Sequence, residues 1–446
     1  MMSRFRLTSS SPNVNLWIVP LKMSLAAIVL FGITIIPDTL AAYHLINLPD
    51  WFTMGGIDDA RAILGAMMGC VSTVLALIFS VALLVLSMVA NLFGPRLLYR
   101  FVQDWVTQAC IGLFMGAFIY VFLVFLVTHK DENSVFIPQI SLITSWLLVL
   151  VAFGFLVFYS HRVAALIQNP DAIGRIVDDL RRAVEQDAPG NNSASHSHYD
   201  ASETQRILSD SANISSLTSG YLQKIDHQAL LSAAAKAGAV ISIPFRPGHF
   251  VLQGETIAFI SPASKLPTLA PLVARGITLG RHRVLNQDLE FGVAQIVEIA
   301  IRALSPAIND TFTGIASVDL LGEALTVLAE TPRSNGRWFD SEGKLRLLVR
   351  PLLLPRLVKQ AFDQIRQAAA DNPAVLIRLL ATIGRLAPKM QGADDRHALA
   401  EQAAAVWEMA NTRPLVKMDR EDIEAAWQKT RIALGSFETS GTEPQP

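Results

Sequence analysis

The stretch Trp105–Val127 reads WVTQACIGLFMGAFIYVFLVFLV and contains no charged residue. Crossing the hydrocarbon core of a bilayer takes about 20 apolar residues in a helix. A helix satisfies every backbone polar group within the segment, so this run predicts a transmembrane helix. Three further runs of similar character lie at residues 16–37, 60–92 and 137–159. We therefore predict an α-helical membrane domain of four helices over residues 16–159, with the lipid bilayer as its partner.

The first apolar run is too long for a signal peptide, and no small-residue cleavage site follows it. Pro37 and Asp38 are expected to end this run. No carboxylate is then expected deep in any span, which argues against a proton-coupled transporter.

The composition excludes some other classes of protein. The charged fraction is 17%, against about 25% in ordinary soluble domains. The net charge of −1 gives no general attraction to nucleic acid, so no nucleic-acid partner is expected. The two cysteines, Cys70 and Cys110, both lie inside apolar runs, which excludes a disulfide framework in the rest of the chain.

Charges in the short loops predict the orientation, because cytoplasmic loops favour Lys and Arg. Arginines precede the first run, occupy the second loop and follow the fourth run, whereas the first loop is acidic: Arg4, Arg6, Arg96, Arg100, Arg162, Arg175, and Asp38, Asp50, Asp58, Asp59. We predict a multi-pass protein with both termini cytoplasmic. The N-terminal segment 1–15 and everything after residue 159 are then cytoplasmic.

Two pairs of glycines are spaced four residues apart in the spans, Gly65 with Gly69 and Gly112 with Gly116. This spacing lets helix backbones approach closely. It indicates packing inside the bundle or, alternatively, contact between copies in a homo-oligomer. The second run is unusually long and is expected to tilt or to protrude from the membrane.

Beyond the membrane domain we expect a juxtamembrane helix and a flexible linker over residues 160–216, followed by a small β module at 217–265. The linker is rich in Ser, Asn, Asp, Pro and Gly between residues 186 and 202. Residues 221–225, 240–245 and 250–260 are strand candidates. Gly248, Val251, Gly254, Ile257 and Ile260 follow a pattern similar to half of a biotinyl- or lipoyl-type β-sandwich. Lys265 lacks the neighbours of a modified lysine, so a carrier role is not favoured.

Residues 266–434 are predicted to form an α-rich domain with one β-hairpin near Asp340–Gly343. Helical periodicity covers residues 357–369, 375–387, 394–410 and 419–434. The tail at 435–446 is predicted to be disordered.

The central segment of this domain predicts a helical hairpin with a polar elbow. An amphipathic helix around residues 291–300 is stopped by Ser305–Pro306. Asn309 or Asp310 then caps a second helix that runs to about Leu328. A cluster of charged and polar side chains near the hairpin forms a candidate site for a small anionic ligand: Arg281, Arg283, Asp288, Arg302, Ser305, Asn309, Asp310 and Thr313.

Three strings carry a family resemblance: SGYLQKID at 219–226, QDLEFG at 287–292 and RALSPAINDTFT at 302–313. With them, the chain resembles the predicted bacterial membrane proteins grouped as DUF2254. The resemblance covers nearly the whole chain and implies an inner-membrane location, without implying an activity. At Thr311 this chain departs from the proline associated with that position.

The sequence contains no recognisable nucleotide, hydrolase, zinc or dinucleotide motif, and we expect no cofactor and no metal. The leading hypothesis is therefore not an enzyme. It is a homo-oligomeric channel-like protein or sensor whose cytoplasmic domain regulates the membrane bundle. One alternative is a membrane-bound enzyme or ligand-binding protein that uses the elbow, with Asp288 and Asp310 as acid and base. A scaffold for protein partners, or a purely structural network at the elbow, remains open.

Overall fold

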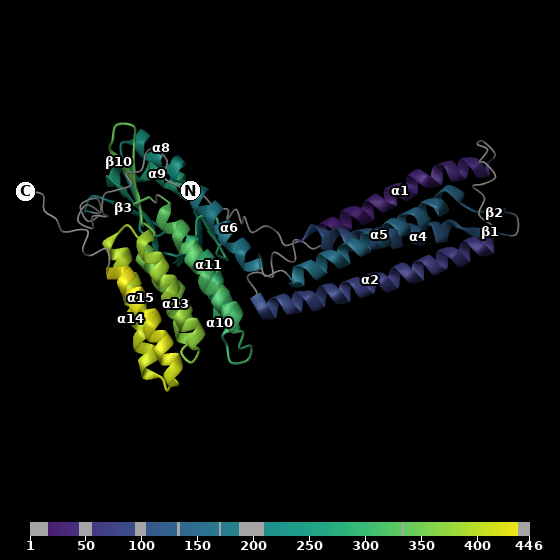
Figure 1. Cartoon of the computed structure of the whole chain (residues 1–446). Helices are drawn as coiled ribbons and strands as arrows, with labels where there is room; N and C mark the ends of the chain where they lie inside the picture. Colours follow the sequence, from purple (N-terminus) through teal and green to yellow (C-terminus); the bar gives the residue numbers. More distant parts are fainter. Residues whose placement is uncertain are drawn as a thin grey trace, which may run out of the picture. The chain divides into compact units, whose positions relative to one another are not determined.

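The computed structural model describes residues 17–43, 56–93, 104–131, 134–168, 171–186, 209–331 and 334–435. The chain divides into two compact units, residues 13–169 and residues 170–446 (Figure 1). The predicted N-terminal segment and most of the predicted linker and tail lie outside the described residues.

The first unit consists of the four expected apolar helices, which pack side by side (Figure 1). They are α1 (Ile18–Ala42), α2 (Ile57–Phe93), α4 (Trp105–Val127) and α5 (Gln139–Gln168). A short antiparallel hairpin of β1 (His129–Asp131) and β2 (Ser134–Phe136) joins α4 to α5. Helix α4 packs against the other three and buries Phe114, Ala117 and Tyr120 completely. The other three helices expose large apolar side chains, as expected of helices that face lipid.

The first helix is longer than predicted, because α1 continues past Pro37 and Asp38 to Ala42. The expectation that these residues end it is wrong. Asp38 is only 4% exposed, and its carboxylate accepts hydrogen bonds from Ile140 N (2.8 Å), Ser141 N (2.9 Å) and Ser141 Oγ (2.6 Å). It therefore caps the start of α5 from another helix. Thr34 Oγ1 links Ser141 to Tyr120 OH and extends this network into the bundle.

The two glycine pairs have different environments. A Cβ at Gly112 would lie 2.7 Å from Met23 Sδ and 3.0 Å from Pro20 Cα. The glycine pair on α4 therefore allows α1 to pack closely against α4. Gly65 and Gly69 have nothing within 4 Å of an added Cβ. Packing inside the bundle therefore explains one pair and leaves the other on an open face of α2.

The second unit combines two small sheets with a layer of helices. Its strands are β3 (Ala212–Ser215), β4 (Gly220–Ile225), β5 (Val240–Ile243), β6 (Phe250–Val251), β7 (Thr256–Ser261), β8 (Ile277–Gly280), β9 (Arg337–Phe339) and β10 (Leu345–Val349). Its helices are α6 (Asp171–Gln186), α8 (His227–Ala237), α9 (Leu266–Gly276), α10 (Leu289–Ala303), α11 (Thr311–Glu330), α12 (Leu354–Ala368), α13 (Pro373–Leu386), α14 (Ala393–Thr412) and α15 (Lys417–Gly435). Single helical turns lie at Ala263–Lys265 and Ala387–Lys389.

The larger sheet has the strand order β3-β7-β5-β10-β9, and the smaller sheet has the order β6-β4-β8. The pairing of β5 with β10 is parallel, and the other pairs are antiparallel. Helices α8 and α9 contribute Leu230, Leu269 and Val273 to the apolar core shared with both sheets. The predicted β-hairpin, β9 with β10, thus joins the same sheet as strands of the predicted β module.

The strand predicted over residues 250–260 is divided in the structure. Strand β6 pairs with β4 in the small sheet, whereas β7 pairs with β3 and β5 in the large one. Gly254, at φ +85°, makes the turn between them. The separation of a β module at 217–265 from an α-rich domain at 266–434 stays a prediction.

The helical layer places α10 against α6, α11 and α12, while α13 contacts α11, α14 and α15. Five of the described helices are long and apolar enough to cross a membrane, namely the four of the first unit and α11. Helix α11, however, packs among the helices of the second unit. Its Asp319 and Glu323 form ion pairs with Arg385 and Arg181.

Candidate functional site

The start of α10 is a buried junction of charged side chains. Asp288 is 2% exposed and caps the helix by accepting a hydrogen bond from Phe291 N (3.1 Å). Arg283 donates two hydrogen bonds to the same carboxylate, from Nε (2.6 Å) and Nη2 (2.7 Å). Its guanidinium also lies over the Phe291 ring, 5.5 Å from the ring centre. Asp288 is therefore held in place by both a helix start and a bidentate arginine.

A glycine turn closes over this carboxylate. Gly248 has φ +93°, and a Cβ at this position would lie 2.5 Å from Asp288 Oδ2. Only glycine allows both this backbone conformation and this approach. The turn follows β5 and carries Arg246 toward the first turn of α10.

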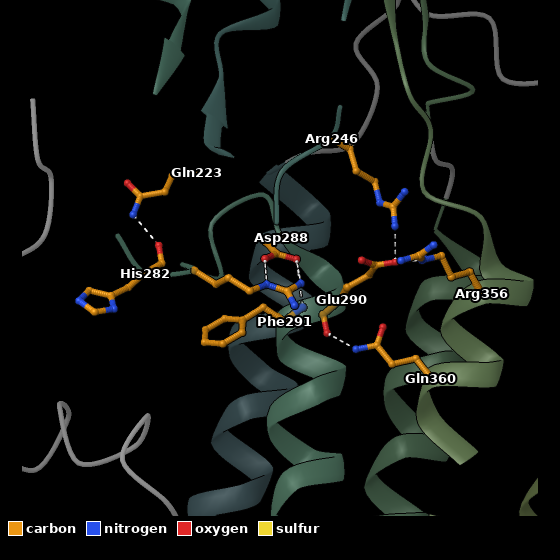
Figure 2. Close-up of polar contacts among 9 residues, drawn as sticks. Gln223, Arg246, His282, Asp288, Glu290, Phe291, Arg356 and Gln360 are labelled. Atoms are coloured by element: carbon orange, nitrogen blue, oxygen red, sulfur yellow. Dashed lines mark hydrogen bonds and ion pairs between the residues drawn. The ribbon is translucent and has the colours of Figure 1, made fainter. Parts of the chain in front are cut away.

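Glu290 lies between two arginines from distant parts of the chain, as Figure 2 shows. Arg246 Nη2 donates to Glu290 Oε1, and Arg356 Nε donates to the same oxygen at 2.8 Å. Gln360 Nε2 donates to the backbone carbonyl of Glu290 at 3.0 Å (Figure 2). Arg246 and Glu290 are only 5% and 6% exposed, so the loss of either charge would leave the other buried without its partner.

The pKa values show how strongly this region is desolvated and how positive it is. Burial lowers the pKa of Arg246 although Glu290 opposes the change. Desolvation acts in the same direction on Arg283, but the hydrogen bonds and charge of Asp288 outweigh it and raise the pKa of Arg283. Burial first, and then the charges of Arg246 and Arg350, lower the pKa of His249 to about 4. Burial likewise lowers the pKa of His227 to about 4.

A small pocket of about 80 Å³ opens beside the junction. Its lining includes Arg246, Asp288, Glu290, Arg350, Trp338 and His227. The His227 ring stacks on Trp338 with centroids 4.6 Å apart and planes at 15°. Val184, near the end of α6, also reaches the pocket. The pocket thus collects side chains from α6, α8, α10, the Pro247–Gly248 turn and the end of β10.

Two donors of the pocket have no acceptor among the residues that the structure describes. Arg246 Nε is buried and has no hydrogen-bond partner there. The exposed Arg350 side chain makes no hydrogen bond or ion pair within the part of the chain that the structure describes. A buried donor without a partner costs about 1–3 kcal/mol, so the pocket has unused capacity for an acceptor group.

The elbow after α10 has a different character. Asp310 caps α11 by accepting from Thr313 N (3.0 Å) and Thr313 Oγ1 (2.6 Å), and these bonds lower the pKa of Asp310. Asn309 has φ +50°, in the left-handed region that Asn tolerates. Ser305 Oγ donates to the carbonyl of Arg302 at 2.7 Å. The groups of the elbow thus bond to one another, while Phe312 is 85% exposed.

The structure separates the eight residues predicted to form one site. Arg283 and Asp288 lie at the start of α10, whereas Arg302 lies in its last turn and Ser305, Asn309, Asp310 and Thr313 lie beyond that end. Helix α10 has 15 residues and is about 22 Å long, and this length separates the two groups. Arg281 is exposed and does not line the pocket. Ligand binding by these eight residues stays a prediction.

Several residues of the pocket could not be predicted as site residues from the sequence: Arg246, Arg350, His227 and Trp338. Each comes from a segment distant from α10, and only the Pro247–Gly248 turn gave a local signal. Within the described residues, no group of three His, Cys, Asp or Glu side chains is arranged to hold a metal ion.

The apolar helices of the first unit, followed in the sequence by a separate α/β unit, define a multi-pass membrane protein. The chain belongs to the family described as "Predicted membrane protein (DUF2254)", whose model matches residues 13–385. It is 27% identical over 376 residues to the uncharacterized proteins Rv1290c of Mycobacterium tuberculosis and Mb1321c of Mycobacterium bovis. The match covers 81% of this chain and 70% of each relative. No solved structure matches the chain.

Proposed function

We propose that this protein is a bacterial inner-membrane sensor with both termini in the cytoplasm. Its C-terminal unit binds a small anionic ligand in the Arg246 pocket and thereby regulates the transmembrane helices. The observation that carries the proposal is the pocket itself, a recess lined by arginines in which a buried donor lacks a partner. The arginine bias of the N-terminus, the second loop and the segment after α5 supports the orientation.

Helix α6 provides a route from the pocket to the membrane helices. It begins at Asp171, three residues after α5 ends at Gln168, and its Val184 lines the pocket. Its Leu180 fits against Gly292 of α10 so closely that a Cβ there would lie 2.6 Å from Leu180 Cδ1. A ligand that moves the start of α10 is therefore expected to move α6, which follows α5 in the chain.

Native mass spectrometry of the detergent-purified full chain would look for a retained small molecule. Hydrogen exchange with and without that ligand would then test the coupling. We expect slower exchange in α6 and a changed rate at the end of α5, and a flexible Gly-Gly-Ser insertion after Gln168 should abolish only the change in α5. Protection of the pocket with no change in α5 of the unaltered protein would contradict regulation through α6.

Open glycines on α2 favour a second candidate, a homo-oligomeric channel-like protein. Gly65 and Gly69 offer a close-packing face that no other described helix occupies. Helix α2 has 37 residues and is about 55 Å long, more than a bilayer core requires. Partner copies at this face would bring the exposed Cys70 close to its counterpart.

Cross-linking between Cys70 residues in membranes would test this candidate. We expect dimers in the unaltered protein, their loss in Gly69→Leu, and their retention in Gly154→Leu, which changes an equally open glycine on α5. Flux assays on reconstituted vesicles would then test conduction. A monomeric mass together with no cross-link would exclude the homo-oligomer.

The geometry gives no support to joint acid–base catalysis by Asp288 and Asp310. Each carboxylate caps a different helix, and α10 lies between them. A general acid and a general base must both reach one substrate, which this separation prevents.

A further inference from the structure

We infer that the ligand of the Arg246 pocket is a small dianionic oxyanion, either inorganic phosphate or the phosphate group of a monoester, held between Arg246 and Arg350. This inference rests on the proposed function and specifies the chemistry of its ligand.

The charges around the pocket leave an excess of two positive charges. Two arginines, Arg246 and Arg350, and two acids, Asp288 and Glu290, line the pocket. Arg283 and Arg356 lie outside the lining and add two positive charges through their ion pairs with Asp288 and Glu290. Arg283 neutralises Asp288, and one of the two arginines that contact Glu290 neutralises Glu290. The other of these two arginines and Arg350 then have no acidic partner. A dianion balances that excess, whereas a monocarboxylate leaves one charge in a desolvated site. Phosphate oxygens also match the donor geometry of arginine.

The free donors and the size of the pocket agree with this class of ligand. Arg350 is exposed and can close on an anion from solvent, while the Nε of Arg246 lacks an acceptor deeper in the protein. Because that Nε is closed to solvent, we expect the guanidinium to turn when the anion binds. A volume of about 80 Å³ accommodates a phosphate group and is far below the roughly 300 Å³ or more of typical drug-sized sites.

Neither histidine near the pocket adds a positive charge at pH 7. Burial first, and then the charges of Arg246 and Arg350, lower the pKa of His249 to about 4. His227 also has a pKa lowered to about 4 and is therefore neutral at pH 7. Its ring stacks on Trp338 and adds an uncharged surface to the pocket lining, so Arg246 and Arg350 supply the positive charge of the lining.

The phosphate group has two possible sources, a soluble phosphate compound or a phospholipid headgroup, and the chemistry of recognition is the same. Calorimetric titration of the full chain in detergent with inorganic phosphate, at constant ionic strength set with chloride, tests the site itself. Repeating the titration in nanodiscs with and without phosphatidic acid separates the sources. Competition by phosphatidic acid assigns the site to a headgroup, and unchanged phosphate binding assigns it to a soluble compound.

Two arginine variants make the test specific. Arg350→Gln removes a pocket donor that the fold does not use, so we expect phosphate affinity to fall by about tenfold or more. Arg281→Gln removes an exposed arginine close in sequence but outside the pocket, and we expect a change of less than about twofold. Saturable binding of one phosphate per chain with this contrast supports the inference. No phosphate binding, or equal losses in the two variants, overturns it.

The outcome separates this inference from the proposed function. If native mass spectrometry recovers a neutral or cationic molecule in the pocket and phosphate does not bind, the sensor proposal stands and the phosphate inference fails. If phosphate binds as expected but exchange in α5 does not respond, the ligand assignment stands and the sensor proposal fails.

Discussion

Helices α10 and α11 both begin with a capping aspartate, but the two aspartates lie in different environments. Asp288 caps α10 and accepts from Phe291 N, and Asp310 caps α11 and accepts from Thr313 N. Each aspartate thus bonds to the backbone N–H three residues later. Side chains from α8, β9 and β10 line the pocket beside Asp288, whereas the elbow around Asp310 is largely satisfied by its own neighbours.

The difference shows that a capping signal fixes a helix start but does not define a site. Arg283 pairs with the cap residue Asp288, Arg246 and Arg350 line the adjoining pocket, and Arg356 pairs with Glu290 in the first turn of α10. At Asp310 the neighbouring Phe312 remains open to solvent. Chemistry therefore depends on what the fold brings to a helix start, and the two ends of α10 can be compared by matched substitutions.

The largest effect is expected for Glu290→Ala. This change leaves the buried Arg246 without its partner, which typically costs about 3–5 kcal/mol of the free energy of unfolding. Its matched control is Glu298→Ala near the other end of α10, where Glu298 forms a more exposed pair with Arg302 at 3.6 Å. That change should cost less than about 1 kcal/mol. Denaturant unfolding followed by hydrogen exchange in α10 measures both, and similar costs would contradict the comparison.

The second largest effect is expected in the stability of the fold at acidic pH. The pKa values of His227 and His249 are about 4 in the folded chain and 6.5 in the unfolded chain, so the unfolded chain binds more protons between these values. Stability is therefore complete above pH 6.5 and falls as the pH decreases toward 4. Each unit of lowered pKa is worth about 1.4 kcal/mol, and partial exposure reduces the total to about 2–3 kcal/mol.

A His227→Gln, His249→Gln double variant should lose this pH dependence, as measured by thermal unfolding at intervals from pH 7 to pH 4.

The stability that the elbow contributes changes over a different, lower range of pH. The pKa of Asp310 is lowered by its bonds to Thr313, so its contribution is present above about pH 4 and is lost only below it. Asp310→Asn should therefore leave the profile from pH 7 to pH 4 unchanged, and a flatter profile in this variant would contradict the assignment.

Local and compositional signals were enough to predict the frame of the molecule. Four apolar runs became four helices, and Pro306 with Asp310 marked the end of α10 and the start of α11, because these signals depend on lipid solubility and on neighbouring backbone groups. The continuation of α1 past Pro37 was missed. Asp38 is stabilised by N–H groups of α5, about a hundred residues later, and no local pattern encodes that contact.

The candidate site could be predicted only in part for the same reason. The sequence pointed to Asp288. Arg246 and Arg350 line the same pocket as Asp288 only because β10 pairs in parallel with β5, about a hundred residues earlier. Conversely, Arg302 and Asp310 follow Asp288 closely in the sequence, yet the rigid length of α10 keeps them away. Proximity in sequence thus suggested a single cluster that helix geometry divides.

The third prediction makes the same substitution at both caps. Asparagine is as good a cap as aspartate, so Asp310→Asn should cost less than about 0.5 kcal/mol. Asp288→Asn keeps the cap but loses the charge that pairs with Arg283, and hydrogen bonds to charged groups contribute about 1.5–3 kcal/mol. We expect a cost of about 2 kcal/mol in denaturant unfolding. Equal costs would mean that Arg283 contributes nothing beyond the cap.

The smallest effect is expected at the exposed elbow. Phe312→Ser removes a side chain that is 85% exposed, so the free energy of unfolding should change by less than about 0.5 kcal/mol. Phe291→Ser, at the start of α10, removes a buried ring and should cost about 3 kcal/mol or more. Thermal unfolding of the purified full chain measures both. A cost above about 1 kcal/mol for Phe312→Ser would mean that the ring is covered in the intact protein, and the contrast between a buried site and an open elbow would then no longer hold.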